Sequence, residues 1–248
     1  MWPYPKVVAH RGAGLLAPEN TLAALQTGWQ HGYRAVEFDV MLSKDQLPVL
    51  FHDEEFGRTV KAKGRLCDWL AADLVQLDAG SWHSPAFAGT GICLYQQALE
   101  YCRQQQIWMN VEIKPASGHE QNTGKIVAEL TQQAFADVPV IELAQLPLLS
   151  SFSKTALLAA KQAAPNLPRA YLLEQLHQDW LSEAQELAVL AIHLNQQYLT
   201  QAQVRLLKDA GYGVFCYTVN QVERAQELLR WGIDGFCTDR LDLFPYDF

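Results

Sequence analysis

Short apolar runs with strand character alternate with helical runs along the 248-residue chain, and this alternation constrains the fold more than any other feature. The expected core strands are 7–9, 35–40, 107–113, 146–152, 169–173, 187–194, 213–219 and 234–238. Helices are expected near 21–31, 95–105, 119–135, 153–163, 178–186, 200–209 and 221–230, with Asn20 as a candidate cap of the first. Repeated strand–helix units predict a parallel sheet, and eight of them predict a (β/α)₈ TIM barrel in one α/β domain, residues 1–248.

A doubly wound open sheet also explains the alternation. In a barrel, however, the carboxyl ends of all strands converge on one face and gather residues that are far apart in sequence. Polar side chains end or follow several of the predicted strands, and this placing favours the barrel. A hairpin-like segment, 47–52, is followed by a stretch rich in Gly, Asp, Trp and Ser from about 54 to 93. That stretch is too long for an ordinary loop, so we interpret it as a small insertion after the second barrel strand, beside the active face.

Three carboxylates are expected on the inward faces of two neighbouring strands. Strand side chains alternate, so Glu37 and Asp39 share one face while Phe38 points the opposite way, and Glu112 comes from strand 107–113. Solvated strand ends paired with Arg or Lys are the alternative interpretation. Buried carboxylates are costly when unpaired, and hard divalent cations prefer oxygen ligands. We therefore predict one divalent metal ion on these carboxylates, with Mg²⁺ preferred and Ca²⁺ or Mn²⁺ as alternatives.

Two histidines, His10 and His52, each end an apolar run and precede a charged residue. The unperturbed pKa of histidine lies near neutral pH, so two histidines flanking an acidic pair predict a general acid and a general base. The pattern does not decide which histidine has which role. The other histidines lack this setting and are interpreted as structural or surface residues: His31, His83, His119, His177 and His193. Of these, His193 falls late in the sixth strand.

Arg11 and Lys114 are the candidate phosphate-binding side chains, Arg11 through bidentate hydrogen bonds and Lys114 as a point charge. Together with three carboxylates and one divalent ion, they bring the formal charge of the site to about +1 at neutral pH. A phosphodiester carries one negative charge and would neutralise it. The balance therefore favours a diester over a dianionic monoester.

In chain order, these residues form a pattern that resembles the glycerophosphodiester phosphodiesterase family, of the bacterial cytosolic type. The pattern comprises His10-Arg11-Gly12, Pro18-Glu19-Asn20-Thr21, Glu37-x-Asp39, His52-Asp53, Glu112-x-Lys114 and Tyr217-Thr218-Val219-Asn220. The resemblance implies a TIM barrel, a divalent metal and hydrolysis of deacylated phospholipids, such as glycerophosphocholine and glycerophosphoethanolamine, to sn-glycerol 3-phosphate and an alcohol.

By motif match, the resemblance assigns catalysis to His10 and His52. It assigns metal ligation to Glu37, Asp39 and Glu112, and phosphate binding to Arg11 and Lys114. The family often has Trp at the seventh-strand position where this chain has Tyr217, and an aromatic wall for the glycerol group survives that change. The implied partner is a small glycerophosphodiester.

Two other functions stay open. A phospholipase-type barrel acting on intact lipids needs an apolar rim, and the insertion offers Trp69, Trp82 and Phe87, spaced singly among polar residues. A non-catalytic binding barrel is expected to have lost a catalytic histidine or a metal carboxylate, and all of them are present in the sequence.

Charge and composition exclude other classes of function. The net charge of −8 argues against a nucleic-acid partner, because such binding depends on a basic face. No run approaches the about 18 apolar residues of a membrane span, and the first residues do not have the pattern of a signal peptide. The five scattered cysteines lack CxxC spacing, which indicates reduced thiols. We therefore expect a cytoplasmic protein without membrane insertion; the sequence does not predict its oligomeric state.

Overall fold

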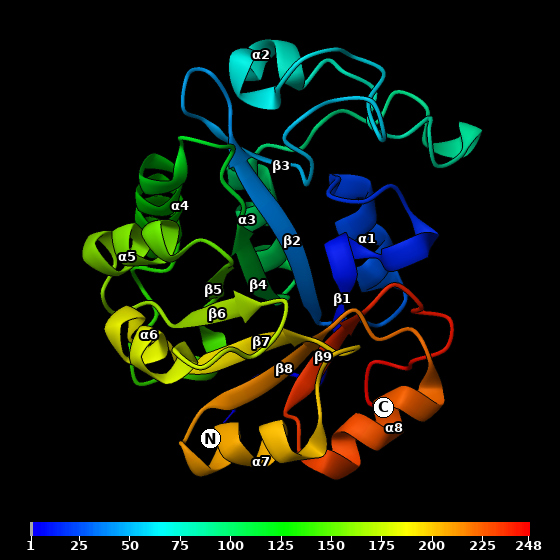
Figure 1. The fold of residues 1–248 in the computed structure, drawn as a ribbon. Coiled ribbons are helices and arrows are strands. Elements are labelled where there is room, and N and C mark those ends of the chain that lie inside the picture. Colours follow the sequence, from blue (N-terminus) through cyan, green and yellow to red (C-terminus); the bar gives the residue numbers. More distant parts are fainter. Residues whose placement is uncertain (1) are drawn as a thin grey trace.

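The computed structural model describes residues 2–248, and its strands form one closed sheet (Figure 1). Closure follows because β1 (Val7–Ala9) pairs in parallel with both β2 (Ala35–Leu42) and β9 (Gly235–Thr238). The other parallel strands are β4 (Trp108–Ile113), β5 (Leu148–Ser151), β6 (Arg169–Leu173), β7 (Ala191–Asn195) and β8 (Gly213–Tyr217). A further strand, β3 (Pro48–Leu50), pairs antiparallel with β2. The predicted (β/α)₈ barrel is confirmed.

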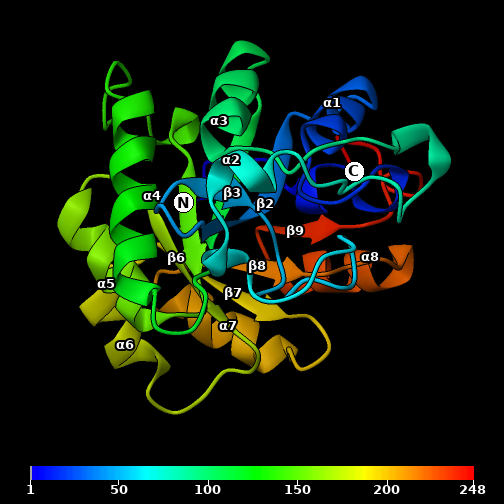
Figure 2. The ribbon, with the colours of Figure 1, turned by 90° about the horizontal axis from the view of Figure 1, so that it is seen from above.

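Helices surround the sheet in Figures 1 and 2. They are α1 (Leu22–Gln30), α3 (Tyr95–Gln104), α4 (Glu120–Ala134), α5 (Lys154–Ala163), α6 (Trp180–Leu187), α7 (Gln201–Asp209) and α8 (Val222–Trp231). The cap of α1 is Thr21, whose hydroxyl accepts a hydrogen bond from the Ala24 amide, and not Asn20 as the sequence predicted. Among the described helices, none is long and apolar enough to cross a bilayer.

Outward-facing strand residues and the inner faces of the helices form the main hydrophobic core. On β2, for example, Val36, Phe38 and Val40 point outward and are fully buried in this core. The alternation of side chains along a strand then directs Glu37 and Asp39 into the barrel. The same packing that stabilises the sheet therefore places two carboxylates in the barrel interior.

A second core closes the amino end of the barrel from inside. It includes Trp108 and Leu148, the first residues of β4 and β5, and Phe215 from the middle of β8, together with Trp2 and Tyr4 from the chain preceding β1. The rings of Tyr4 and Trp108 stack at 4.4 Å, and those of Trp2 and Phe215 at 5.7 Å. We call the four aromatic residues Trp2, Tyr4, Trp108 and Phe215 the aromatic plug. Within the described residues, this plug fills the barrel interior toward the amino ends of the strands.

The chain between β3 and α3 forms a small structure of its own. It contains the 3₁₀ turn Leu66–Asp68, the short helix α2 (Ala71–Leu74) and the 3₁₀ turn Pro85–Phe87. A separate hydrophobic cluster, which includes Leu66 and Leu74, packs this segment against Met41 of β2 and Val49 of β3. Viewed from above in Figure 2, the segment lies in front of these two strands. It is thereby held beside the end of the barrel where the polar side chains lie.

One strand begins later than the sequence indicates. Strand 187–194 was expected, but Leu187 is the last, buried residue of α6, and β7 begins at Ala191. Ala188 adopts a left-handed conformation with φ of 51°, which ends the helix. The sequence from Leu187 to Leu194 is nearly continuously apolar, so hydrophobic spacing cannot show where the helix stops and the strand starts.

The close contact between α4 and α5 predicts that a larger residue at Gly124 destabilises the protein. A Cβ atom added at Gly124 would lie 2.1 Å from the Ala156 carbonyl oxygen. We expect Gly124→Ala to lower the free energy of unfolding by about 1–3 kcal/mol, because the helices must move apart. The exposed Asn122→Ala on the same helix is the control and should change it by less than about 0.5 kcal/mol. Chemical denaturation measures both variants, and equal stability of Gly124→Ala and wild type would contradict the prediction.

Candidate active site

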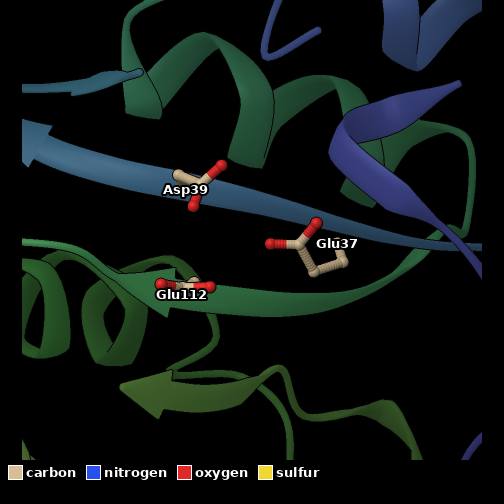
Figure 3. A group of neighbouring side chains, drawn as sticks. All are labelled: Glu37, Asp39 and Glu112. Atoms are coloured by element: carbon tan, nitrogen blue, oxygen red, sulfur yellow. The ribbon is translucent and has the colours of Figure 1, made fainter. Parts of the chain in front are cut away.

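Three carboxylates from β2 and β4 converge inside the barrel, with Glu112 near the carboxyl end of β4 (Figure 3). Glu37 and Asp39 come from β2, and Glu112 from β4 lies directly beside Asp39 in the strand pairing. One oxygen of each side chain lies within 4.8 Å of the others. Glu37 and Asp39 are 4% and 1% exposed. The structure thus brings together the three carboxylates that the sequence selected, and we call them the carboxylate cluster.

The three carboxylates of the cluster repel one another when they are ionised. Burial, and then the charge of Asp39, raise the pKa of both Glu37 and Glu112. Burial also acts to raise the pKa of Asp39, but the positive charges of Lys114 and Arg11 outweigh it and lower that pKa. Three carboxylates this close together, two of them buried and the third 12% exposed, cannot all ionise unless positive charge is placed among them. Their oxygen-only donor set and their need for positive charge fit a hard divalent cation.

Asn20 orients Asp39 within the cluster. Its side-chain amide donates to Asp39 Oδ2 at 2.8 Å, and its carbonyl oxygen accepts from the Asp39 amide at 3.0 Å. Asn20 itself has a left-handed φ of 57°. The residue predicted to cap a helix instead holds one of the carboxylates in place.

His10 leaves the end of β1 in a 3₁₀ turn and is held by a carboxylate that the sequence analysis missed. Its Nδ1 lies 2.6 Å from Asp239 Oδ1, while its Nε2 lies 3.8 Å from Glu37 Oε2. Burial acts to lower the pKa of His10, but the bond to Asp239 and the charge of Glu37 outweigh it and raise that pKa. Asp239 in turn accepts a 2.8 Å bond from Asn220. The signal in the sequence that could have identified Asp239 is its position directly after β9, the last barrel strand.

His52, which follows β3, has the same arrangement with a different partner. Its Nδ1 lies 2.7 Å from Asp53 Oδ1. Here the pKa is lowered, because burial and the nearby charges of Arg11 and Lys114 outweigh the attraction of Asp39 and Asp53. The two histidines therefore share a carboxylate partner at Nδ1 and differ in the direction of their pKa shifts.

Arg58 connects the residues around His52 to those around Arg11. Its Nε donates to Asp53 Oδ2 at 2.7 Å, and its Nη1 donates to Glu19 Oε2 at 2.7 Å. Glu19 also accepts a 2.7 Å bond from Arg11 Nη1. Arg58 belongs to the segment between β3 and α3, so that segment contributes directly to the positions of His52 and Arg11. The sequence analysis did not select Arg58.

All eight predicted site residues line one pocket of about 240 Å³. They are His10, Arg11, Glu37, Asp39, His52, Glu112, Lys114 and Tyr217. Lys114 Nζ lies 3.1 Å from Glu112 Oε1 and 3.5 Å from Asp39 Oδ1. Arg11 Nε approaches Asp39 Oδ2 from another direction, at 3.5 Å. The two cations thus flank the carboxylate cluster, where an anion can contact both.

Tyr217, at the end of β8, forms part of an aromatic wall of the pocket. Its hydroxyl donates to the Leu173 carbonyl oxygen at 3.0 Å, which fixes the ring. Phe152 meets this ring edge to face at 5.8 Å, and Lys114 Nζ lies 5.9 Å from the Phe152 centroid. Phe152 is 44% exposed and was not selected from the sequence. The wall is therefore built by two aromatic side chains and not by Tyr217 alone.

His193, interpreted from the sequence as structural, also lines the pocket. It is 1% exposed, and its ring lies 4.7 Å from Phe215 and 6.3 Å from Trp2 of the aromatic plug. Burial lowers the pKa of His193 to about 3, so its ring is neutral near pH 7. The other four histidines that the sequence analysis interpreted as structural or surface residues do not line the pocket.

Comparison with known proteins agrees with this geometry. Residues 10–243 match the model of the glycerophosphoryl diester phosphodiesterase family. A structure of an Oleispira antarctica phosphodiesterase in complex with the product sn-glycerol-3-phosphate is 35% identical; the match covers 98% of this chain and 94% of that one, with a TM-score of 0.89. Glycerophosphodiester phosphodiesterases from Bacillus subtilis and Caldanaerobacter subterraneus are each 29% identical, over 96% and 94% of this chain and 84% and 93% of theirs.

The closed barrel and the polar groups gathered at one end of it define a TIM-barrel hydrolase of phosphoric diesters. The chain belongs to the glycerophosphoryl diester phosphodiesterase family.

The hydrogen bond between Asp239 and His10 predicts a positioning role for Asp239. Asp239→Ala should lower kcat/KM by about 10-fold or more, because His10 loses the group that orients its ring; loss of an acid–base group itself costs about 10²–10⁴-fold. Asp242→Asn, which breaks an ion pair with Arg240 on the surface, is the control and should leave the rate unchanged. Steady-state kinetics on folded variants measure the effect, and a wild-type rate for Asp239→Ala would show that Asp239 has no such role.

The buried neutral His193 predicts a pH-dependent stability. Unfolding restores its pKa from about 3 to 6.5, so the unfolded chain takes up a proton below pH 6.5 and stability falls as the pH is lowered. His193→Gln removes this contribution, and the difference in unfolding free energy between the variant and the wild type should change by up to about 1.4 kcal/mol per pH unit. Urea denaturation between pH 7 and pH 5 measures it. Gln175→Ala, at an exposed position without a titratable side chain, should run parallel to wild type; a parallel curve for His193→Gln would refute the prediction.

Proposed function

We propose that this protein hydrolyses glycerophosphodiesters, such as glycerophosphocholine and glycerophosphoethanolamine, to sn-glycerol 3-phosphate and an alcohol, with the aid of a divalent metal ion. The observation that carries the proposal is the meeting of three carboxylates, two histidines and two cations in one pocket. The similar Oleispira antarctica phosphodiesterase is described in complex with the product sn-glycerol-3-phosphate, which supports the same product here.

In this proposal Glu37, Asp39 and Glu112 hold one divalent ion, with Mg²⁺ preferred over Ca²⁺ or Mn²⁺. When bound, the ion polarises the phosphoryl oxygens and stabilises the charge that develops on them. Arg11 and Lys114 bind the phosphate, because both lie within 3.5 Å of Asp39 and so border the same space as the cluster. When the diester binds, attraction to its oxygens would replace part of the attraction between each of these cations and Asp39.

His10 and His52 are the proposed acid–base pair. Each has its Nδ1 on a carboxylate, Asp239 or Asp53, which leaves Nε2 for proton transfer. One histidine removes the proton from the nucleophile, and the other protonates the departing alkoxide. The nucleophile is either water or the neighbouring hydroxyl of the glycerol group, which would pass through a cyclic phosphate.

Tyr217 is proposed to form the wall for the glycerol group, with Phe152 beside it. Of the three aromatic residues that the sequence offered for a lipid-binding rim, Trp69 and Phe87 are partly buried and Trp82 is 39% exposed, and one exposed ring makes a poor apolar rim. Trp69 packs against Phe56 at 5.6 Å, and the indole N–H of Trp82 donates to the Ala79 carbonyl oxygen. A small glycerophosphodiester therefore fits better than an intact lipid.

We also propose a single domain over residues 1–248, with residues 54–93 as the insertion, that works in the cytoplasm without nucleic-acid partners. All five cysteines are buried free thiols, which suits a reducing compartment. The net charge of −8 disfavours nucleic acid.

Metal removal tests the role of the carboxylate cluster. Excess EDTA should abolish release of glycerol 3-phosphate from glycerophosphocholine, and Mg²⁺ or a similar ion should restore it. Glu112→Gln should lower the metal-dependent rate by orders of magnitude, because one anionic ligand is lost. Glu129→Gln, at an exposed position on α4, serves as the control and should behave as wild type. Full activity in EDTA, with no metal detected by elemental analysis, would rule out the metal assignment.

Leaving-group chemistry separates the two histidines. A basic alkoxide needs protonation as it departs, whereas p-nitrophenolate needs little. Replacing the general acid should therefore slow glycerophosphocholine cleavage by about 10²–10⁴-fold and affect the p-nitrophenyl diester of glycerol much less. Replacing the general base should slow both substrates. His10→Ala and His52→Ala are compared, with His177→Ala as the surface control.

Circular dichroism establishes that the histidine variants fold. If a folded His10→Ala or His52→Ala variant keeps wild-type rates on glycerophosphocholine, that histidine is structural and the two-histidine mechanism is wrong.

A further inference from the structure

The pocket continues beside Glu37 and one layer of inward-facing side chains below Glu112. Asn110 lies two residues before Glu112 on β4, on the same face, and pairs with Glu37 of β2. His193 faces inward from β7, on the far side of the barrel in the strand order. Both residues line the pocket, and they are 3% and 1% exposed. We call Asn110 and His193 the polar floor of the pocket.

The polar floor has hydrogen-bonding atoms that the protein itself does not satisfy. Asn110 Oδ1 and both ring nitrogens of His193 have no hydrogen-bond partner among the described protein groups. A buried polar atom without a partner loses its hydrogen bonds to water without replacement, and nearly all buried polar groups in proteins are therefore paired. These atoms therefore indicate a ligand that enters the pocket.

Solvent cannot reach the polar floor from the amino end of the barrel. The ring of Phe215 lies 4.7 Å from that of His193, and Trp2 stacks on Phe215 at 5.7 Å. The aromatic plug thus closes the barrel beneath the floor. A ligand of these atoms must approach from above, past the carboxylate cluster, which is the path of the substrate.

The atoms of the polar floor match one kind of ligand group. The His193 ring is neutral, so it offers one N–H donor and one nitrogen acceptor, and Asn110 Oδ1 is a further acceptor. A hydroxyl group accepts from the His193 N–H and donates its single proton to Asn110 Oδ1, so it can pair with one atom of each side chain. A phosphate or carboxylate oxygen only accepts, and an ammonium group only donates.

We propose that His193 and Asn110 form a binding site for a hydroxyl oxygen at the inner end of the pocket, supplied either by the terminal hydroxyl of the substrate's glycerol group or by an ordered water molecule. The glycerol source rests on the proposed function, whereas the water source does not. With the glycerol source, the polar floor selects glycerol phosphate over diesters that present a methyl group at the same place.

The test compares glycerophosphocholine with an analogue that lacks only the terminal hydroxyl of the glycerol and keeps the neighbouring one. His193→Leu removes the donor and acceptor, and His193→Gln keeps one of each. If the glycerol hydroxyl binds the floor, His193→Leu should lower kcat/KM for glycerophosphocholine by about 10-fold or more, the scale of one specific hydrogen bond. It should change kcat/KM for the analogue much less, and His193→Gln should recover most of the loss. Asn110→Leu is a second, independent variant.

A crystal structure of the wild-type protein without substrate, at high enough resolution to place waters, tests the second source. Equal effects of the variants on both substrates, together with an ordered water bonded to His193 and Asn110, would establish the floor as a water site. Equal effects with no density at the floor would overturn the proposal. If the wild-type protein cleaves neither substrate, the proposed function fails, while the crystal structure still decides whether the floor binds a hydroxyl oxygen.

Discussion

The placing of three carboxylates inside the barrel is the constraint on which the rest of the site depends. Glu37, Asp39 and Glu112 are driven inward by the burial of their outward-facing neighbours, such as Phe38, in the main core. Their mutual repulsion is tolerable only with positive charge close by. Lys114 and Arg11 supply part of it, and the raised pKa of Glu37 and Glu112 shows that they do not supply all of it. The site is thereby prepared for a cation and for an anionic substrate.

Around this centre, further carboxylates hold the two histidines and Arg11. Asp239 and Asp53 each bind the Nδ1 of a histidine, and Glu19 binds Arg11. Arg58 joins two of these carboxylates and ties the segment between β3 and α3 to the barrel. The segment is stable enough for this role because it has its own hydrophobic cluster against β2 and β3. Precise positions of His52 and Arg11 therefore depend on packing well outside the pocket.

The sequence predicted the barrel and the eight residues that meet in the pocket, because strand alternation and strand ends are local signals. β1 and β6 have the predicted limits, whereas the start of β7 was wrong, since α6 and β7 share one apolar run. The sequence also did not show that Thr21 caps α1 and that Asn20 instead binds Asp39. Either residue type can cap a helix, and only the position of Asp39 decides which one does.

By itself, the sequence determined the order of strands and helices and which side chains face inward, since both follow from periodicity along the chain. Tertiary structure decided which distant residues become partners. Asp239 reaches His10 only because β9 closes the barrel against β1, and Arg58 reaches Glu19 only because its segment folds back over β2 and β3. His193 became part of the pocket for the same reason. Closing a sheet brings together strand ends that are far apart along the chain, and no local pattern records such distances.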